Sequence, residues 1–172
     1  MSQNCVIKGS LISIDDKDKK KIELLKAGDK LLSYSIEGIE NTQDESLLGK
    51  TKVNNFEGEF SYQLIKNIWK KNLSGYYNIN NELFITEDHF VICKRGDEYF
   101  WSRVENLKIG DSLFKLDNSF EEIKDIQKIE EEKTVYNIQV NSIYTFFANG
   151  YLVHNGSASC PNVTDCYACY HA

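Results

Sequence analysis

The stretch Ile22-Glu-Leu-Leu-Lys-Ala-Gly-Asp-Lys-Leu-Leu32 occurs in a second version later in the chain. It aligns without a gap on Val104-Glu-Asn-Leu-Lys-Ile-Gly-Asp-Ser-Leu-Phe114, with identical residues at six of the eleven positions. A Gly-Asp turn before a strand is common, but six identities argue against chance. Two copies in 172 residues are too few for a solenoid. The repeat therefore predicts a duplicated β fold whose halves are related by an approximate two-fold axis.

Short β-type runs surround both copies and are separated by clusters of Gly, Asn, Asp and Ser, a pattern typical of an all-β domain. The isoleucines at 123, 126 and 129 recur every third residue, as in a helical turn, yet we assign strand there as well. The expected strands are Cys5–Ile14, Lys30–Ile36, Tyr62–Lys70, Glu82–Cys93, Glu98–Trp101, Ser112–Leu116, Val135–Val140 and Tyr144–His154.

Composition narrows the function classes. The net charge of -6 and the pI of about 5.1 argue against a nucleic-acid-binding surface. No segment reaches eighteen consecutive apolar residues, so we expect no transmembrane helix. The first residues lack the basic and apolar regions of a signal peptide. We therefore expect a cytoplasmic monomer whose five cysteines are thiols.

Three short motifs stand out beside the repeat. Cys5 opens the first β-type run, Thr86-Glu-Asp-His89 follows an apolar strand, and His154-Asn155 ends the last one. In this order the motifs resemble the Hint superfamily, which includes inteins, bacterial intein-like domains and the autoprocessing domain of hedgehog proteins. The resemblance covers residues 5–155 and implies an all-β horseshoe with pseudo-two-fold symmetry. The interval between His89 and Val135 is too short for a homing endonuclease, so this would be a minimal domain.

At the N-terminal end, the resemblance implies that Cys5 attacks the carbonyl carbon of Asn4 and converts the Asn4–Cys5 amide to a thioester. A thiol suits this role because it ionises more readily than a hydroxyl. His89 would protonate the departing amide nitrogen, since its ordinary pKa lies near neutrality, and Thr86 would hydrogen-bond nearby. Cys93, between Ile92 and Lys94, is better interpreted as a buried structural residue.

At the C-terminal end, Asn155 would attack its own main-chain carbonyl through its side-chain amide. This step closes a succinimide and breaks the Asn155–Gly156 bond, with His154 polarising the carbonyl or protonating the leaving amine. Asn-Gly is also a common turn pair and is prone to deamidation instead. Cleavage wins over deamidation only if the fold holds the Asn155 side chain in position to attack its own main-chain carbonyl.

Three positions depart from the family pattern. Gly156 stands where splicing inteins have Cys, Ser or Thr, so ordinary splicing is in doubt and separate cleavage at the two ends is favoured. We expect Gly156 to lie at an exposed boundary. The freed amine of Gly156 could still attack the thioester directly. Asn137 replaces a frequent Asp and can only hydrogen-bond, and Tyr144 replaces a frequent His and is at best a weak acid.

The flanking segments, residues 1–4 and 156–172, would be the substrate, and the resemblance implies no cofactor. The second flank contains Cys160, Cys166, Cys169 and His171. Cys166 and Cys169 form a Cys-x-x-Cys pair that could supply two zinc ligands. The five residues between Cys160 and Cys166, however, fit no common spacing of zinc ligands. A disordered or host-protein fragment is the favoured interpretation of this tail.

Two other functions compete with self-processing. A non-catalytic Hint-fold binding or structural module would be expected to lose at least one of the five motif residues, all of which are present here. A hedgehog-like domain that passes its thioester to an external nucleophile needs no C-terminal cleavage, so the His154-Asn155 pair argues against it.

Overall fold

The computed structural model describes residues 4–156. In that range the chain forms thirteen strands and two short 3-10 helices. The strands are β1 (Val6–Ile7), β2 (Leu11–Ser13), β3 (Lys19–Lys21), β4 (Lys30–Ile36), β5 (Gly58–Ile79), β6 (Leu83–Ile85), β7 (Phe90–Arg95), β8 (Glu98–Arg103), β9 (Ser112–Phe114), β10 (Phe120–Glu122), β11 (Ile126–Val140), β12 (Thr145–Ala148) and β13 (Tyr151–His154). The helices are η1 (Ile22–Leu24) and η2 (Val104–Asn106). Neither helix has the length or apolar character needed to cross a membrane.

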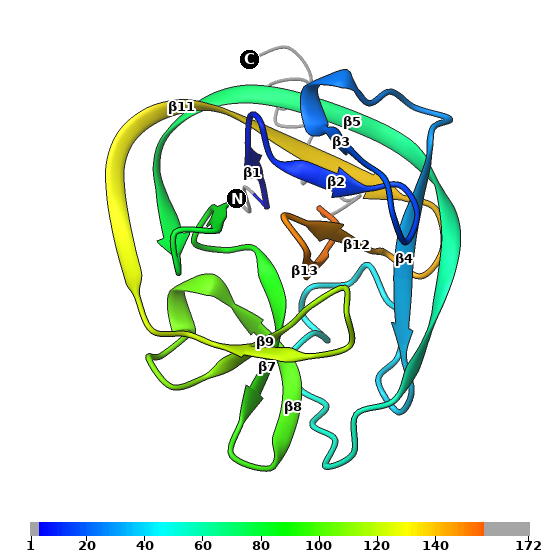
Figure 1. The fold of residues 1–172 in the computed structure, drawn as a ribbon, viewed down its shortest axis with the longest axis vertical. Coiled ribbons are helices and arrows are strands. Elements are labelled where there is room, and N and C mark those ends of the chain that lie inside the picture. Colours follow the sequence, from blue (N-terminus) through cyan, green and yellow to red (C-terminus); the bar gives the residue numbers. More distant parts are fainter. Residues whose placement is uncertain (1–3, 157–172) are drawn as a thin grey trace.

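The strands form two sheets that together make a horseshoe. The long antiparallel strands β5 and β11 curve around the outside, and β1, β12 and β13 lie in the space that they enclose (Figure 1). The first sheet has the order β11-β1-β6-β5-β4. The second has the order β10-β9-β7-β13-β12-β2-β3, with β8 added on β7. This arrangement carries both ends of the described chain into the centre of the molecule.

The two copies of the sequence repeat fold alike. Each begins with a 3-10 helix, η1 or η2, whose first side chain is fully buried. In the first copy the Gly28 N–H donates to the carbonyl of Ile65 at 2.8 Å, and the Ile65 N–H donates to the carbonyl of Asp29 at 2.8 Å. The second copy has the same pair of bonds, at 3.0 and 2.7 Å, among Gly110, Ile123 and Asp111. The all-β fold with pseudo-two-fold symmetry is therefore as predicted.

The backbone conformation of the two glycines explains why both copies of the repeat have Gly at this position. Gly28 and Gly110 have φ of 92° and 96°, a left-handed conformation that only glycine adopts without strain. The following carboxylates, Asp29 and Asp111, accept the N–H of the residue three positions earlier, at 2.9 and 2.8 Å. Each copy is thus a turn closed by its own aspartate.

Several strands differ in length from the sequence prediction. β5 continues past the polar cluster at residues 72–75, because β11 pairs with it on both sides of an irregularity between Ile129 and Glu132. The isoleucines at 126 and 129 precede this irregularity and pair in continuous register with Ile79 and Tyr76, so their three-residue spacing places them on opposite faces of β11 rather than on one face of a helix. Ile123 itself lies fully buried just before β11. The predicted strand Glu82–Cys93 is broken into β6 and β7, and the break contains the Thr86–His89 motif.

Candidate active site

The N-terminal junction is held by backbone pairing. β1 lies between β11 and β6, so Cys5, which precedes it, is only 3% exposed. The Cys5 N–H donates to the hydroxyl oxygen of Thr86 at 2.9 Å, and the Thr86 N–H donates to the carbonyl of Cys5 at 3.0 Å. Thr86 is therefore hydrogen-bonded directly to the nitrogen of the Asn4–Cys5 peptide.

Asn4, on the other side of this peptide, sits between two carboxylates. Its N–H donates to Asp88 Oδ1 at 3.0 Å, and its side-chain amide donates to the carboxylate of Glu45. Its φ of 39° lies in the left-handed region, which asparagine enters more readily than most residues. The residue is 2% exposed. Neither Asp88 nor Glu45 was assigned a role from the sequence, although Asp88 lies inside the Thr86–His89 motif.

The C-terminal junction is equally buried, and its strongest contacts are again to the main chain. The Asn155 N–H donates to the carbonyl of Tyr144 at 2.8 Å, and the Gly156 N–H donates to the carbonyl of Ile138 at 3.0 Å. The Asn155 amide oxygen, turned towards Val140, accepts its N–H at 3.0 Å, and the amide nitrogen then donates to the Gly156 carbonyl at 3.2 Å. The attacking nitrogen thus donates to the carbonyl of the residue that directly follows the bond that it would break.

His154 reaches the scissile carbonyl of this junction. Its Nδ1 lies 3.0 Å from the carbonyl oxygen of Asn155, and its Nε2 lies 2.8 Å from that of Thr42. Burial lowers the pKa of His154 to about 4, despite the two carbonyl partners. At neutral pH the ring is therefore neutral and carries one proton. It can donate to only one of the two carbonyls at a time.

His89 lies between the two junctions. Its ring is 1% exposed, and Nε2 lies 2.5 Å from the carbonyl oxygen of His154. A carbonyl can only accept, so this nitrogen carries the proton. Nδ1 has no hydrogen-bond partner among residues 4–156. Burial lowers the pKa of His89, partly offset by the His154 carbonyl, the charge of Asp88 and the nearby backbone of Cys5. The result is a neutral imidazole with an available lone pair.

The position of Gly156 corrects one expectation. The residue is buried rather than at an exposed boundary. A Cβ built on it would lie 1.7 Å from Oδ1 of Asn137, so any side chain there must displace the Asn137 amide. That amide oxygen is itself buried without a partner among the described residues. Asn137 therefore packs against the glycine and leaves no space for a side-chain nucleophile.

Tyr144 contributes to the site through its backbone. It ends a run of three residues with φ between 52° and 66°, and its carbonyl accepts the Asn155 N–H. Its ring lies 6.5 Å, between centroids, from the His154 ring. The strained turn thus places a carbonyl where Asn155 needs an acceptor, a role that the side chain alone does not suggest.

The remaining cysteine of the described chain lies in the core. Cys93 is fully buried, and burial together with the nearby charge of Asp111 raises its pKa to about 12. Such a thiol does not ionise at neutral pH, which fits a structural residue. Within residues 4–156 no group of three or more potential ligands is placed to hold a metal ion. The tail residues Cys160, Cys166, Cys169 and His171 lie outside the described range.

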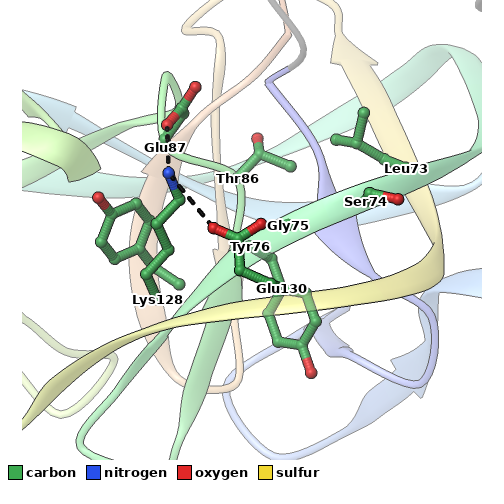
Figure 2. Close-up of a pocket in the computed structure, with 9 residues that line it drawn as sticks. Leu73, Ser74, Gly75, Tyr76, Thr86, Glu87, Lys128 and Glu130 are labelled. Atoms are coloured by element: carbon green, nitrogen blue, oxygen red, sulfur yellow. Dashed lines mark ion pairs between the residues drawn. The ribbon is translucent and has the colours of Figure 1, made fainter.

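A cavity of about 250 Å³ ends on Thr86. It lies over the irregularity between β5 and β11, and Lys128 stands at its rim between Glu87 and Glu130, with nitrogen–oxygen distances of 3.9 and 3.6 Å (Figure 2). All three charged side chains are more than half exposed, so these ion pairs add little stability. The cavity reaches the N-terminal junction only through Thr86.

Comparison with solved structures gives matches across most of the chain. A bacterial intein-like domain from Clostridium thermocellum shares 19% identity with a TM-score of 0.68, covering 90% of this chain and all of that one. A transcription factor IIB mini-intein shares 19% identity with a TM-score of 0.61, covering 88% and 99%. The DnaB intein from Synechocystis shares 15% identity with a TM-score of 0.57, covering 88% and 98%.

The likeness is confined to structure. No protein-family model and no curated protein matches the sequence. At this level of identity the matches establish the architecture and leave the chemistry to be argued from the residues. The fold of this chain is the Hint fold of inteins and bacterial intein-like domains.

Proposed function

We propose that the chain is a single-turnover, autocatalytic peptide-bond cleaver that acts on its own flanking segments. The observation that carries this proposal is the position of His89 between the two junctions. Its ring contacts the His154 carbonyl, and its turn places Thr86 on the Asn4–Cys5 peptide. The turn that carries Thr86 and His89 thus contacts both junctions, which lie far apart in the sequence, and a non-catalytic module would not need this arrangement.

At the N-terminal junction, the sulfur of Cys5 attacks the carbonyl carbon of Asn4. The carbon–sulfur bond forms, the carbon–nitrogen bond breaks, and the proton lost by the thiol is transferred to the Cys5 nitrogen, which leaves as an amine. Thr86 holds that nitrogen at 2.9 Å, and His89 is the candidate proton carrier because it is neutral and buried. Water or a free thiol then releases residues 1–4. The reaction needs a reduced thiol, which fits the proposal that the chain works in the cytoplasm.

At the C-terminal junction, the side-chain nitrogen of Asn155 attacks the carbonyl carbon of the same residue. A succinimide forms, and Gly156 leaves as a free amine that takes up a proton. His154 Nδ1, 3.0 Å from the carbonyl oxygen, donates to it when it carries the ring proton and so stabilises the developing negative charge. No cofactor or metal enters either step.

Separate cleavage is favoured over ligation of the flanks. Splicing by transesterification requires a hydroxyl or thiol on the residue after Asn155. Gly156 has no side chain, and the Asn137 amide occupies the space where one would lie. Direct attack of the Gly156 amine on the thioester is the remaining route to a ligated product.

Intact-mass spectrometry with and without dithiothreitol tests the proposal. We expect loss of residues 1–4, faster with thiol, and loss of residues 156–172 without it, while Cys5→Ala removes only the first product. The matched control is Cys93→Ala, which changes the other described cysteine and should still release residues 1–4. An unmodified chain of constant mass would favour a non-catalytic module instead. Abundant ligated flanks would contradict the preference for cleavage.

A further inference from the structure

A short segment, residues 42–46, contacts both junctions from one side. The carbonyl oxygen of its first residue, Thr42, lies 2.8 Å from His154 Nε2. Its second, Gln43, accepts at Oε1 from the Gln139 amide of β11 at 3.2 Å. The segment is therefore attached to the C-terminal half of the site, independently of the N-terminal flank.

The segment also has an internal turn that fixes its last residues. Asp44 Oδ1 accepts the N–H of Ser46 at 3.0 Å and its hydroxyl at 2.6 Å. The Asp44 N–H in turn donates to the hydroxyl oxygen of Thr42 at 3.0 Å. Glu45 lies in the middle of this turn, so its side chain starts from a backbone that is already held in place.

Glu45 uses this position to contact the residue before the scissile bond. Its carboxylate accepts from the side-chain amide of Asn4, while Asp88 Oδ1 accepts the Asn4 N–H at 3.0 Å. Asn4 is 2% exposed, so water cannot replace these contacts. A side chain held against the Glu45 carboxylate must present an N–H and must not be an anion.

We propose that Glu45 is a specificity-determining and positioning residue, which selects an N–H-bearing side chain at position 4 and so aligns the Asn4–Cys5 peptide. This proposal rests on the proposed function, since it names the flank that the N-terminal step accepts. Glu45 does not touch the reacting atoms. It acts through Asn4, whose carbonyl carbon is the point of attack.

The proposal is tested by moving the carboxylate from position 45 to position 4, with the variants Asn4→Asp and Glu45→Gln. All variants carry Asn155→Ala, so only the N-terminal junction reacts, and the rate of dithiothreitol-induced release of residues 1–4 is measured by mass. Asn4→Asp places an anion against Glu45 and should slow release at least tenfold. Adding Glu45→Gln to Asn4→Asp supplies an amide donor to the new carboxylate and should restore most of that loss. A merely structural role for Glu45 would not produce such rescue.

A glycine at position 4 separates the contact from the backbone conformation. Asn4→Gly keeps the left-handed φ accessible but removes the amide, so Glu45→Gln should change its rate less than twofold. The proposal is overturned if Asn4→Asp is as slow with Glu45→Gln as without it, or if Asn4→Asp is not slowed. If the Asn155→Ala chain releases nothing with thiol, the proposed function itself has failed.

Discussion

Thr86 shows how closely single residues are shared within the candidate site. Its N–H and its hydroxyl both bind the backbone of Cys5, and the hydroxyl also lies 3.2 Å from Asp88 Oδ1. Asp88 accepts the N–H of Asn4 in the same place. Two side chains from one turn thus hold both residues of the N-terminal junction, which keeps that peptide in one orientation.

At the residue scale, Gly156 and Asn137 give a test of why flanks would be cut rather than joined. Gly156→Cys alone should slow cleavage after Asn155 about tenfold or more, because the new side chain meets the Asn137 amide and shifts the bond from its geometry. Combining it with Asn137→Ala removes the obstruction and supplies a thiol acceptor. The double variant should then yield ligated flanks, detected by mass.

The matched control is Asn137→Ala alone, which provides space but no nucleophile and should give no transesterification product. Ligation by Gly156→Cys without a change at Asn137 would show that the amide moves aside easily. The steric argument would then be wrong.

The site was only partly predictable from the sequence. Cys5, Thr86, His89, His154 and Asn155 occur in recognisable motifs, and the structure brings them together at two adjoining junctions. Thr42 and Glu45 belong to a polar segment without periodicity, and the contact at Thr42 is through its carbonyl, which any residue carries. The packing of Asn137 on Gly156 depends on the register of β11 and could not be read from spacing.

At the scale of elements, the two copies of the repeat have diverged around the same aspartate. Asp111 is 3% exposed and pairs with Arg95, with a nitrogen–oxygen distance of 2.8 Å. Burial alone would raise its pKa, but the hydrogen bonds from Arg95 and from the Lys108 N–H hold the pKa below the ordinary value. Asp29 pairs with Lys26, whose side chain is 78% exposed.

Asp111→Ala should therefore destabilise the fold more than Asp29→Ala. The first change leaves a buried turn unclosed and Arg95 without its partner, which should cost about 2–3 kcal/mol of unfolding free energy. The second removes an exposed pair and one backbone contact, for about 1 kcal/mol. Urea unfolding of both variants measures the difference. Equal losses would mean that the turn itself, and not its surroundings, carries the stability.

The elements also show where sequence reasoning about the fold succeeds and where it does not. The repeat and the strand Lys30–Ile36 follow from local signals, a Gly-Asp turn and an apolar run, which act within a few residues. The full length of β5 does not, since residues 72–75 have turn-forming side chains. Only pairing with β11 keeps them extended, and the partners there lie 58 to 62 residues away in the sequence (Ser74 with Glu132, Asn72 with Thr134).

At the scale of the whole molecule, the free energy of unfolding should depend on pH, because His89 and His154 are buried in their neutral form. Burial lowers the pKa of His154 from 6.5 to about 4 and also lowers that of His89. The unfolded chain therefore binds more protons than the folded one below about pH 6.5. Stability should be full above that pH and should decline as the pH falls towards 4. His154 alone accounts for about 3 kcal/mol across this window.

Urea unfolding between pH 7 and 5 measures this slope, in a chain with Cys5→Ala and Asn155→Ala so that nothing is cut. Adding His154→Gln should remove the contribution of one histidine and flatten the slope. The third histidine of the sequence, His171, lies in the flank outside the described residues, so the variant His171→Gln measures separately whether the flank adds to the slope. A steep slope that survives His154→Gln would assign the effect to His89.

The burial of Asn4 and Gly156 has a consequence for populations of molecules. Both peptides enter the site only when β1 and β13 have joined their sheets, so under the proposed chemistry an unfolded chain cannot be cut. Once a folded chain has been cut, the loss is irreversible and remains after any later unfolding. The fraction of full-length molecules in a sample would thus record how much time its chains have spent in the native state since synthesis.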